Sequence, residues 1–294
     1  MKLPNFIIAG GVATGTSFLS HAIQHHSEIY LPKIMRPECG FFYKSWEYKK
    51  GLSYYSQCWF QDVKNETAIG ERSSLYLHGD FLNVAQRIRT DLPDIKLVFC
   101  LRNPTERAHA NYRFSVLSGF EKLSFEDALS EEERRFRKAK GWKGEIQPNL
   151  YRRRGDYKLQ LQPFLQLFPK NQIHFIKSES LSKNTEVEIN KLYDFLGVGY
   201  EPIRDVPSFP SLSVKNNSFQ IMLRKAVGNK MNVLTENSRH GFKENSFLEK
   251  IMRMNLMEEK LPMSSSTRTE LNRFYKDSNS FVKELTGWDV SDWT

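Results

Sequence analysis

Near its N-terminus the chain carries the pattern that most constrains its fold, an apolar run that passes through glycines into an amphipathic segment. The apolar run is residues 6–9, the glycine-rich turn extends from Gly10 to Gly15, and residues 17–25 follow. Apolar side chains recur in that last segment at the spacing of one helical face: Phe18, Leu19, Ala22 and Ile23. A strand, a glycine turn and a helix in this order point free backbone N–H groups and the positive end of a helix at an anion. The sequence therefore predicts a phosphate-type loop, with a turn that only packs a helix on a sheet as the alternative.

This loop departs from those of ATP- and GTP-binding proteins. Gly10 and Gly15 meet the G-x-x-x-x-G spacing, but Thr16 stands where the P-loop needs its lysine, and Ser17 follows. Without that lysine the β- and γ-phosphates of a triphosphate lose their main countercharge. A nucleotide kinase or GTPase is therefore disfavoured.

The overall charge favours anionic ligands without identifying one. The 294 residues include 43 Lys and Arg against 34 Asp and Glu, a formal net charge of +9, which suits a nucleotide, a sulfated glycan or a nucleic acid equally. The cysteines, Cys39, Cys58 and Cys100, have no C-x-x-C spacing, so a disulfide framework or a zinc site is not expected. The first apolar stretch is far shorter than the ~20 residues that cross a bilayer. We expect a cytoplasmic protein that is not inserted in a membrane.

Strand and helix patterns alternate along the chain. Strands are expected at residues 95–101 and 172–176, with shorter extended pieces at 29–32 and at the start of 68–76. Helices are expected at residues 80–89, 105–117, 125–140, 157–168, 187–196 and 264–285. This alternation predicts an α/β fold, a mostly parallel central sheet flanked by helices, in a single domain over residues 1–294. Ligands of such sheets bind beyond the carboxyl ends of the strands, which places the Gly10–Ser17 loop, Glu71 and Arg102 along one edge.

Several segments carry weaker expectations. Residues 43–60 are dense in Tyr and Trp, which is typical of core, with the wall of an acceptor pocket as the alternative. Residues 202–217 are expected to form a long loop, and residues 218–261 are unassigned, with a substrate-covering helical region as one interpretation. The charged helix at 125–140 is expected to be a solvated face. The tail is expected to dock through its tryptophans, and the last helix to turn these residues inward: Leu271, Phe274, Tyr275, Phe281 and Leu285.

Two charged residues at strand ends are candidates for chemistry. Arg102 follows the strand at 95–101 and can bind a phosphate through two N–H groups, or else pair with an acid at a helix start. Glu71 follows another strand and can serve as general base for an acceptor hydroxyl or amine, or else be a surface or salt-bridged glutamate. His78 and His109 are possible auxiliary acids or bases, although a lone histidine near a helix is more often structural.

Taken in order, these segments resemble the sulfotransferase family that uses 3′-phosphoadenylyl sulfate (PAPS), in its bacterial and heparan-type branch. The loop at Gly10–Ser17 is similar to the family's G-x-x-K-T-G-T-[ST] loop for the 5′-phosphosulfate. Residues 70–76 match G-E-[KA]-S-x-x-Y, which supplies the base, and residues 101–112 match L-R-N-P-x-E-R-A-x-S-x-Y, which binds the 3′-phosphate. The likeness extends to 155–157, 168–169, 194–197 and the 285–293 ending, so it covers nearly the whole chain.

The resemblance implies a P-loop-like nucleotide-binding architecture, PAPS as co-substrate, adenosine 3′,5′-bisphosphate (PAP) as product, and no metal. The catalytic residues that it implies or leaves as candidates are Glu71, Lys33 and His109. The residues placed against the nucleotide are Ala13, Thr14, Gly15, Thr16, Ser17, Phe18, Arg102, Ala110, Asn111 and Arg113.

Two alanines depart from the family pattern. Ala13 stands where the family has the loop lysine, and Ala110 where it has the serine that binds the 3′-phosphate. The loss of one such charged contact costs ~3 kcal/mol of transition-state stabilisation, roughly a hundredfold in rate. The cations considered as replacements for the lysine are Lys33, Arg36 and Lys44, and Asn111 or Arg113 is expected to replace the hydroxyl in part.

The implied reaction is direct in-line sulfuryl transfer to a hydroxyl or to an amine or guanidinium nitrogen of a small molecule. A polar natural product such as a saxitoxin-like alkaloid is the acceptor suggested by a weak resemblance to cyanobacterial tailoring enzymes. The alternatives are a carbohydrate sulfotransferase, a nucleotide kinase and a non-catalytic binder of polyanions, for which strong salt dependence would be diagnostic. The expected partners are the acceptor and the nucleotide, without nucleic acid or membrane, in a monomer or homodimer.

Overall fold

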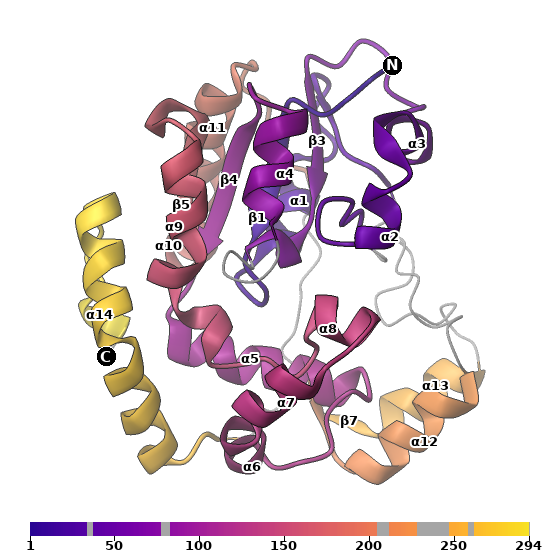
Figure 1. Ribbon diagram of the computed structural model, residues 1–294, viewed down its shortest axis with the longest axis vertical. Coiled ribbons are helices and arrows are strands. Elements are labelled where there is room, and N and C mark those ends of the chain that lie inside the picture. Colours follow the sequence, from indigo (N-terminus) through magenta and orange to yellow (C-terminus); the bar gives the residue numbers. More distant parts are fainter. Residues whose placement is uncertain (34–37, 78–82, 205–211, 228–246, 258–261, 294) are drawn as a thin grey trace.

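A parallel sheet forms the centre of the computed structural model, which describes residues 1–33, 38–77, 83–204, 212–227, 247–257 and 262–293 (Figure 1). The sheet is five-stranded with the order β2-β3-β1-β4-β5. Its strands are β1 (Phe6–Gly10), β2 (Ile29–Tyr30), β3 (Ala68–Arg72), β4 (Lys96–Leu101) and β5 (Ile173–Lys177). Every neighbouring pair is parallel, so all the carboxyl ends lie at one edge. The predicted parallel α/β fold is confirmed.

Helices cover both faces of this sheet, because its strands are apolar on both sides. Ile7 and Ala9 of β1 face one core, while Phe6 and Ile8 face the other. The first core packs against α3 (Gly51–Trp59), α4 (Val84–Asp91), α9 (Tyr157–Leu167) and α14 (Ser265–Thr286). The second packs against α1 (Thr16–Ile23), α10 (Ser178–Lys183) and α11 (Thr185–Leu196). In Figure 1, α4 and α9 lie in front of the strands and α1 lies behind them.

The other helices lie mainly below the carboxyl edge of the sheet in Figure 1 or beside it. They are α2 (Ser45–Tyr48), α5 (Pro104–Leu117), α6 (Phe125–Ser130), α7 (Glu132–Lys138), α8 (Trp142–Ile146), α12 (Asn217–Val227) and α13 (Phe247–Met254). Helix α5 begins directly after β4, and its N-cap Asn103 accepts hydrogen bonds from the backbone N–H groups of Thr105 and Glu106. This cap, with Pro104 in the first turn, fixes where the helix starts and so how it lies below the sheet edge.

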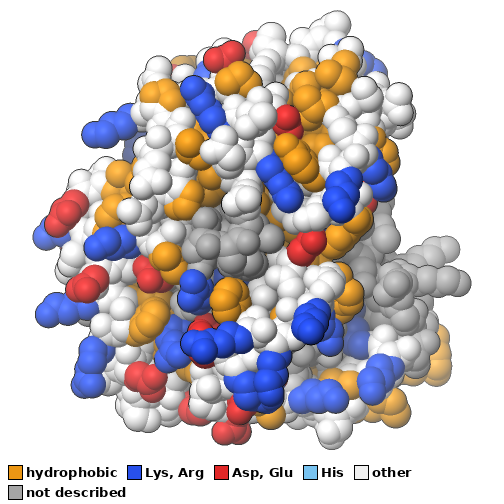
Figure 2. Space-filling model, viewed as in Figure 1, with side chains coloured by type: hydrophobic (Ala, Val, Ile, Leu, Met, Phe, Trp, Pro, Cys, Tyr) orange, Lys and Arg blue, Asp and Glu red, His pale blue; other side chains and the backbone are white. Residues whose placement is uncertain are grey.

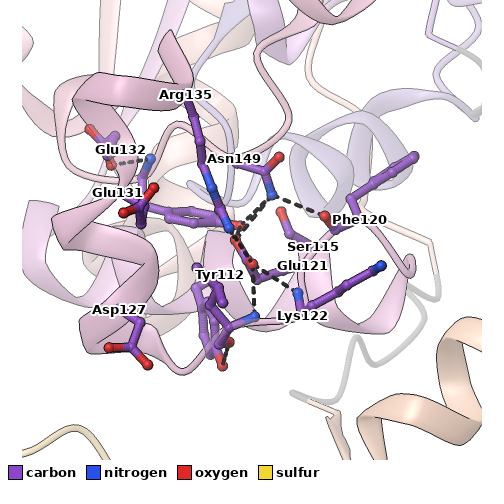
Figure 3. Close-up of polar contacts among 12 residues, drawn as sticks. Tyr112, Ser115, Phe120, Glu121, Lys122, Asp127, Glu131, Glu132, Arg135 and Asn149 are labelled. Carbon is purple, nitrogen blue, oxygen red and sulfur yellow. Dashed lines mark hydrogen bonds and ion pairs between the residues drawn. The ribbon is translucent and has the colours of Figure 1, made fainter. Parts of the chain in front are cut away.

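A buried carboxylate fastens the end of α5 to α7 (Figure 3). Oε2 of Glu121 accepts hydrogen bonds from Arg135 Nη1 at 2.6 Å, from Asn149 Nδ2 at 3.0 Å and from the Tyr151 hydroxyl at 2.8 Å. Burial opposes ionisation of Glu121, but the bonds from Arg135, the Leu123 N–H and Tyr151 outweigh it and hold its pKa below the usual range. Glu121 therefore acts as an ionised anchor for the helices that carry part of the site.

The helix predicted at 125–140 is in fact two helices, α6 and α7, which meet at Glu131. The prediction of a solvated face is also wrong at Glu132, which lies beside the break and is only 4% exposed. Its carboxylate accepts hydrogen bonds from the backbone N–H groups of Tyr151, Arg152 and Arg153 at 2.7–2.9 Å. These partners come from a distant part of the chain, and the local charge pattern carries no sign of them.

The C-terminal segment packs onto the first core, as predicted. Trp293 is fully buried, with its ring 6.1 Å from that of Tyr157, and Trp288 is partly buried against the same core. One residue of α14 departs from the prediction, because Phe274 is 46% exposed. Its ring lies beneath the guanidinium of Arg152, 5.2 Å away, on the side of the helix that turns from the core.

Residues 213–227 and 247–257 form a small unit beside the sheet, at the lower right of Figure 1. The antiparallel pair β6 (Ser213–Val214) and β7 (Leu256–Met257) packs with α13. Strand β6 lies in a segment that was expected to be loop. Within the described residues of 218–261, α12 and α13 are helical. Its substrate-covering role stays a prediction. None of the described helices is both long and apolar enough to cross a membrane.

Candidate functional site

The glycine-rich loop leaves the carboxyl end of β1 and leads into α1. Its turn uses positive φ angles at Gly10 (144°), Ala13 (63°) and Gly15 (90°). The Thr14 hydroxyl, which is buried, accepts from the Gly11 N–H at 3.0 Å and donates to the Gly11 carbonyl at 2.7 Å, while Ser178 Oγ donates to the Thr14 carbonyl. The Thr14 hydroxyl therefore stabilises the turn of the loop, and its hydrogen bonds are made within the protein.

The first turn of α1 is suited to an anion. Its N-cap is Gly15, which is exposed and provides no side-chain cap. The first N–H groups of a helix have no partner within it, and the helix dipole places partial positive charge there. Thr16 is buried, Ser17 is half-buried, and Phe18 turns toward the second core. The predicted anion-binding geometry, strand to glycine turn to uncapped helix, is therefore present.

Arginines from three elements contact this loop. Arg102, after β4, donates from Nη1 to the Ala13 carbonyl at 3.3 Å. Arg107 of α5 donates to the Val12 carbonyl at 3.4 Å, and Arg72 at the end of β3 donates to Ser17 Oγ at 3.2 Å. The parallel order β3-β1-β4 explains this convergence, because β3 and β4 end on either side of β1. Of these three arginines, only Arg102 was expected to lie at the site.

Arg102 and Arg113 form a second cationic point of the site. The side chain of Arg102 makes no ion pair with any described acid, so the alternative prediction of an acid partner has no support among these residues. Arg113 is 8% exposed, and its Nε and Nη1 atoms are buried without a hydrogen-bond partner in the described part of the chain. Burial is the largest cause that lowers the pKa of Arg113, and the positive charge of Arg102 is the second. A buried guanidinium that lacks partners is costly, and an anion bound between these arginines would remove that cost.

The neighbours of Arg113 on α5 take structural positions. Asn111 is 2% exposed, and its Oδ1 accepts from Arg107 at 3.4 Å and from Arg154 at 3.1 Å. Ala110 is half-buried and offers no polar group. His109 packs against Phe125 with a ring separation of 5.0 Å, and burial lowers its pKa to about 4, so it is neutral at pH 7. Its predicted auxiliary role stays a prediction.

Glu71 lies at the end of β3 and is enclosed by polar side chains. It is fully buried, and its Oε1 accepts hydrogen bonds from the hydroxyls of Tyr55 and Tyr76, each at 2.6 Å. Ser73 Oγ donates to its Oε2 at 3.0 Å, and Cys39 is a further hydrogen-bond neighbour. Burial raises the pKa of Glu71, and the bonds from Tyr55 and Tyr76 oppose that rise. The predicted aromatic core at residues 43–60 is thus confirmed at Tyr55, which also contacts the candidate base.

The cations expected to replace a loop lysine lie elsewhere or outside the described residues. Lys44 Nζ donates to the carbonyls of Glu38 at 2.8 Å and Cys39 at 2.7 Å, and burial lowers its pKa. Lys33 is exposed and makes no hydrogen bond to the loop in the part of the chain that the structure describes. Arg36 and His78 lie outside the described residues.

A small pocket adjoins the C-terminal end of α1. Its lining includes Ser20 of α1, Gln24 directly after that helix, Trp59 of α3, Arg72 and Cys39. Two of its lining residues connect it to the site, because Cys39 neighbours Glu71 and Arg72 contacts Ser17. The arrangement can hold an anionic group at the loop and present a second, polar molecule to the same edge of the sheet.

Comparison with known proteins gives one family. The family described as "Sulfotransferase domain" matches residues 3–271. Membrane-associated sulfotransferase kil1 of Dictyostelium discoideum is 33% identical over 116 residues, which are 39% of this chain and 23% of that protein. Heparan sulfate glucosamine 3-O-sulfotransferase 3B1 of Mus musculus is 27% identical over 206 residues, 67% of this chain and 47% of that protein. The chain thus spans less than half the length of these relatives.

Solved structures share the fold. A sulfotransferase from Alicyclobacillus acidocaldarius superposes with a TM-score of 0.72 at 24% identity, covering 100% of this chain and 99% of that one. Mouse sulfotransferase SULT7A1, crystallised with PAP, superposes with a TM-score of 0.50 at 12% identity, covering 98% and 86% of the two chains.

Proposed function

Because this chain belongs to the PAPS-dependent sulfotransferase family, we propose that it transfers a sulfuryl group from PAPS to a hydroxyl or nitrogen of a polar acceptor. The observation that carries this proposal is Arg113 beside Arg102, with its Nε and Nη1 buried and without a hydrogen-bond partner among the described residues. A guanidinium in that state is best explained by an anionic ligand, and PAPS carries phosphate at both its 3′ and 5′ positions. The first turn of α1, which has no side-chain cap, offers backbone N–H groups to the 5′-phosphate.

Different residues bind the 3′-phosphate and the 5′-phosphate of the nucleotide. Arg102 and Arg113 bind the 3′-phosphate, and Arg113 takes over from the hydroxyl that Ala110 cannot supply. The backbone N–H groups from Gly15 to Ser17 hold the 5′-phosphate end. When bound, PAPS supplies an activated sulfur: its bond to the 5′-phosphate oxygen breaks, the electron pair stays with that oxygen, and the acceptor atom bonds to sulfur.

Glu71 receives the acceptor's proton in this proposal. A carboxyl group whose pKa is raised by burial is a better proton acceptor near neutral pH than an exposed one. Its carboxylate is held by the hydroxyls of Tyr55 and Tyr76, which fix its orientation. The acceptor reaches Glu71 by displacing one of these hydroxyls, so the same two residues also keep the base enclosed between turnovers.

The acceptor is a polar or anionic molecule. Figure 2 shows Lys and Arg side chains gathered on the lower half of its face, over the region of α5 to α8. The exposed basic residues of that region include Arg134, Arg137, Lys138 and Lys143. A small polar natural product, such as a saxitoxin-like alkaloid, and a carbohydrate are the two acceptor classes, and the names of the glucosamine sulfotransferase relatives favour the carbohydrate. We further propose a cytoplasmic monomer or homodimer.

Direct transfer tests this function. Purified protein is given PAPS with glucosamine-containing oligosaccharides in one set of reactions and guanidinium alkaloids in another, and PAP release and product mass are measured. PAP released together with an acceptor heavier by one sulfuryl group supports the proposal and assigns the acceptor class. No acceptor-dependent PAP release in either set, from folded protein, favours the second candidate, a non-catalytic relative.

The second candidate, a non-catalytic binder of polyanions, is favoured by Ala13, Ala110 and the net charge of +9. Such a protein would bind heparin with an affinity that falls steeply with salt, and PAP would not compete with it. Competition by PAP at low micromolar concentration would exclude this candidate.

A further inference from the structure

The loop that meets the 5′ end of the nucleotide contains no cationic side chain. Its residues from Gly10 to Ser17 are Gly, Val, Ala, Thr and Ser only. The helix dipole supplies a charge of roughly +0.5, which is small against the charge that a leaving phosphate develops. A cationic side chain at this end of the nucleotide must therefore come from another element.

Arg72 is placed to supply it. It is the last residue of β3 and lies opposite Ile8 of β1, two residues before the loop begins. Its Nη1 donates to Ser17 Oγ at 3.2 Å, so the guanidinium lies against the first turn of α1. The side chain also lines the small pocket beside the C-terminal end of α1.

Glu38 holds this guanidinium in place. Its Oε1 lies 2.7 Å from Arg72 Nη1, and its Oε2 accepts from the Ser74 N–H at 2.8 Å. Ser74 Oγ donates to the same carboxylate. Arg72 is 9% exposed, so its guanidinium acts in a poorly hydrated setting where a charge is worth more than in water.

The other arginines at the loop face different atoms. Arg102 and Arg107 donate to the backbone carbonyls of Ala13 and Val12, on the side of the loop toward α5. Lys44 uses its ammonium on the carbonyls of Glu38 and Cys39. Among the described residues, Arg72 is thus the cation in contact with the helical end of the loop.

We propose that Arg72 is the residue that binds the 5′-phosphate end of the nucleotide and neutralises the charge on the departing phosphate oxygen, with Glu38 as its positioning residue. This inference rests on the proposed function. It explains how a loop with Ala13 in its turn can still serve a leaving phosphate. It also separates the roles of the arginines, with Arg72 at the 5′ end and Arg102 with Arg113 at the 3′ end.

Two nucleotides that differ only in the 5′-phosphate test the proposal. Calorimetric titration compares PAP with adenosine 3′-monophosphate on the wild type, on Arg72→Gln and on a control, Arg137→Gln. The control makes the same change at an exposed position of α7. We expect Arg72→Gln to weaken PAP binding by about tenfold to a hundredfold and to leave adenosine 3′-monophosphate unchanged, because one charge-assisted contact is lost. The control should bind both nucleotides as the wild type does.

A second substitution provides a rescue. Ala13→Lys in the Arg72→Gln background places a cation within the loop itself and should restore most of the PAP affinity. If Arg72→Gln does not fold, Arg72→Lys keeps a charge in a different geometry and should lose PAP affinity selectively, by a smaller factor. The melting temperature of each variant without nucleotide shows whether it is folded.

The outcomes separate the two claims. Wild-type protein that does not bind PAP overturns the proposed function itself. Wild-type protein that binds PAP while the folded Arg72 variants bind it equally well overturns the role of Arg72 alone. An equal loss for both nucleotides also contradicts it, because that result places Arg72 at the adenosine or the 3′-phosphate.

Discussion

At the scale of single residues, the site combines groups that are satisfied by the protein with groups that are not. Glu71 is fully buried and has hydroxyl donors on both carboxylate oxygens, whereas Arg113 is buried with two nitrogens lacking partners among the described residues. The first arrangement stabilises the folded protein without ligand, and the second destabilises it until an anion binds. The two residues should therefore respond to substitution in opposite ways.

Arg113→Met should make the nucleotide-free protein as stable as the wild type or more stable, because it removes a buried charge with two nitrogens that lack partners among the described residues. The same change should weaken PAP binding by about tenfold or more. Denaturant unfolding and calorimetric titration measure the two effects. Arg107→Met is the matched control: Arg107 donates to Val12 and Tyr151 carbonyls, so its loss should destabilise the protein by about 2–4 kcal/mol. A large loss of stability in Arg113→Met would contradict the assignment.

Glu71→Gln should retain PAP affinity while sulfuryl transfer falls by a factor on the order of a thousand, since general-base assistance is lost. The amide still accepts the hydroxyls of Tyr55 and Tyr76 at its oxygen, so the fold should survive. Transfer rates and PAP titration on the same preparation check this. Wild-type transfer in the variant would remove Glu71 as the base.

At the scale of elements, strand β1 and helix α5 determine where the loop and the arginines lie. A Cβ added at Gly70 of β3 would come within 2.1 Å of the Phe6 ring of β1, so these strands fit only with glycine at that position. The end of α5 is fixed in turn by the carboxylate of Glu121. Both features position site residues that they do not contact.

Gly70→Ala should destabilise the protein by about 1–3 kcal/mol, because the added methyl overlaps a buried ring. Phe6→Leu in the same chain makes room for the methyl, so the double variant should be more stable than the sum of the single effects predicts. Denaturant unfolding of the three variants tests the contact. Strict additivity would show that Gly70 and Phe6 are not coupled.

Glu121→Gln should lower the free energy of unfolding by about 2–4 kcal/mol at pH 7. The pKa of Glu121 is depressed in the folded protein, so its ionised form contributes stability above the usual glutamate range and loses it as pH falls through the folded pKa. The difference from the wild type should therefore shrink below about pH 4. Glu133→Gln, on an exposed pair with Arg137, is the control and should change stability by less than about 1 kcal/mol at any pH. A pH-independent difference at Glu121 would contradict the anchor.

At the scale of the whole molecule, the sequence predicted the features that depend on residues close together along the chain. The apolar runs at β1 and β4, the turn at Gly10–Gly15 and the Asn103-Pro104 start of α5 depend on neighbours in sequence, and the structure confirms all of them. The edge that joins the loop, Glu71 and Arg102 follows from parallel strands.

Contacts between segments that are far apart in the sequence could not be predicted from local sequence patterns. Arg72 meets Ser17 and Glu38 through strand order and burial, and the hydroxyls around Glu71 come from α3 and from beyond β3. The break at Glu131 and the exposure of Phe274 likewise depend on partners far along the chain. Arg107 was visible within the motif at 101–112, and its role as a brace for the loop needed the structure.

The central claim is that this sheet edge binds a nucleotide with phosphates at its 3′ and 5′ positions. Thermal unfolding with PAP and with ATP, each at the same concentration, tests it most directly. At a hundredfold excess over its dissociation constant, PAP should stabilise the protein by about 2.7 kcal/mol and raise the melting temperature by about 5 °C or more. ATP should give little shift, because it lacks the 3′-phosphate that Arg102 and Arg113 bind. Equal shifts with both nucleotides, or no shift with PAP, would contradict the account.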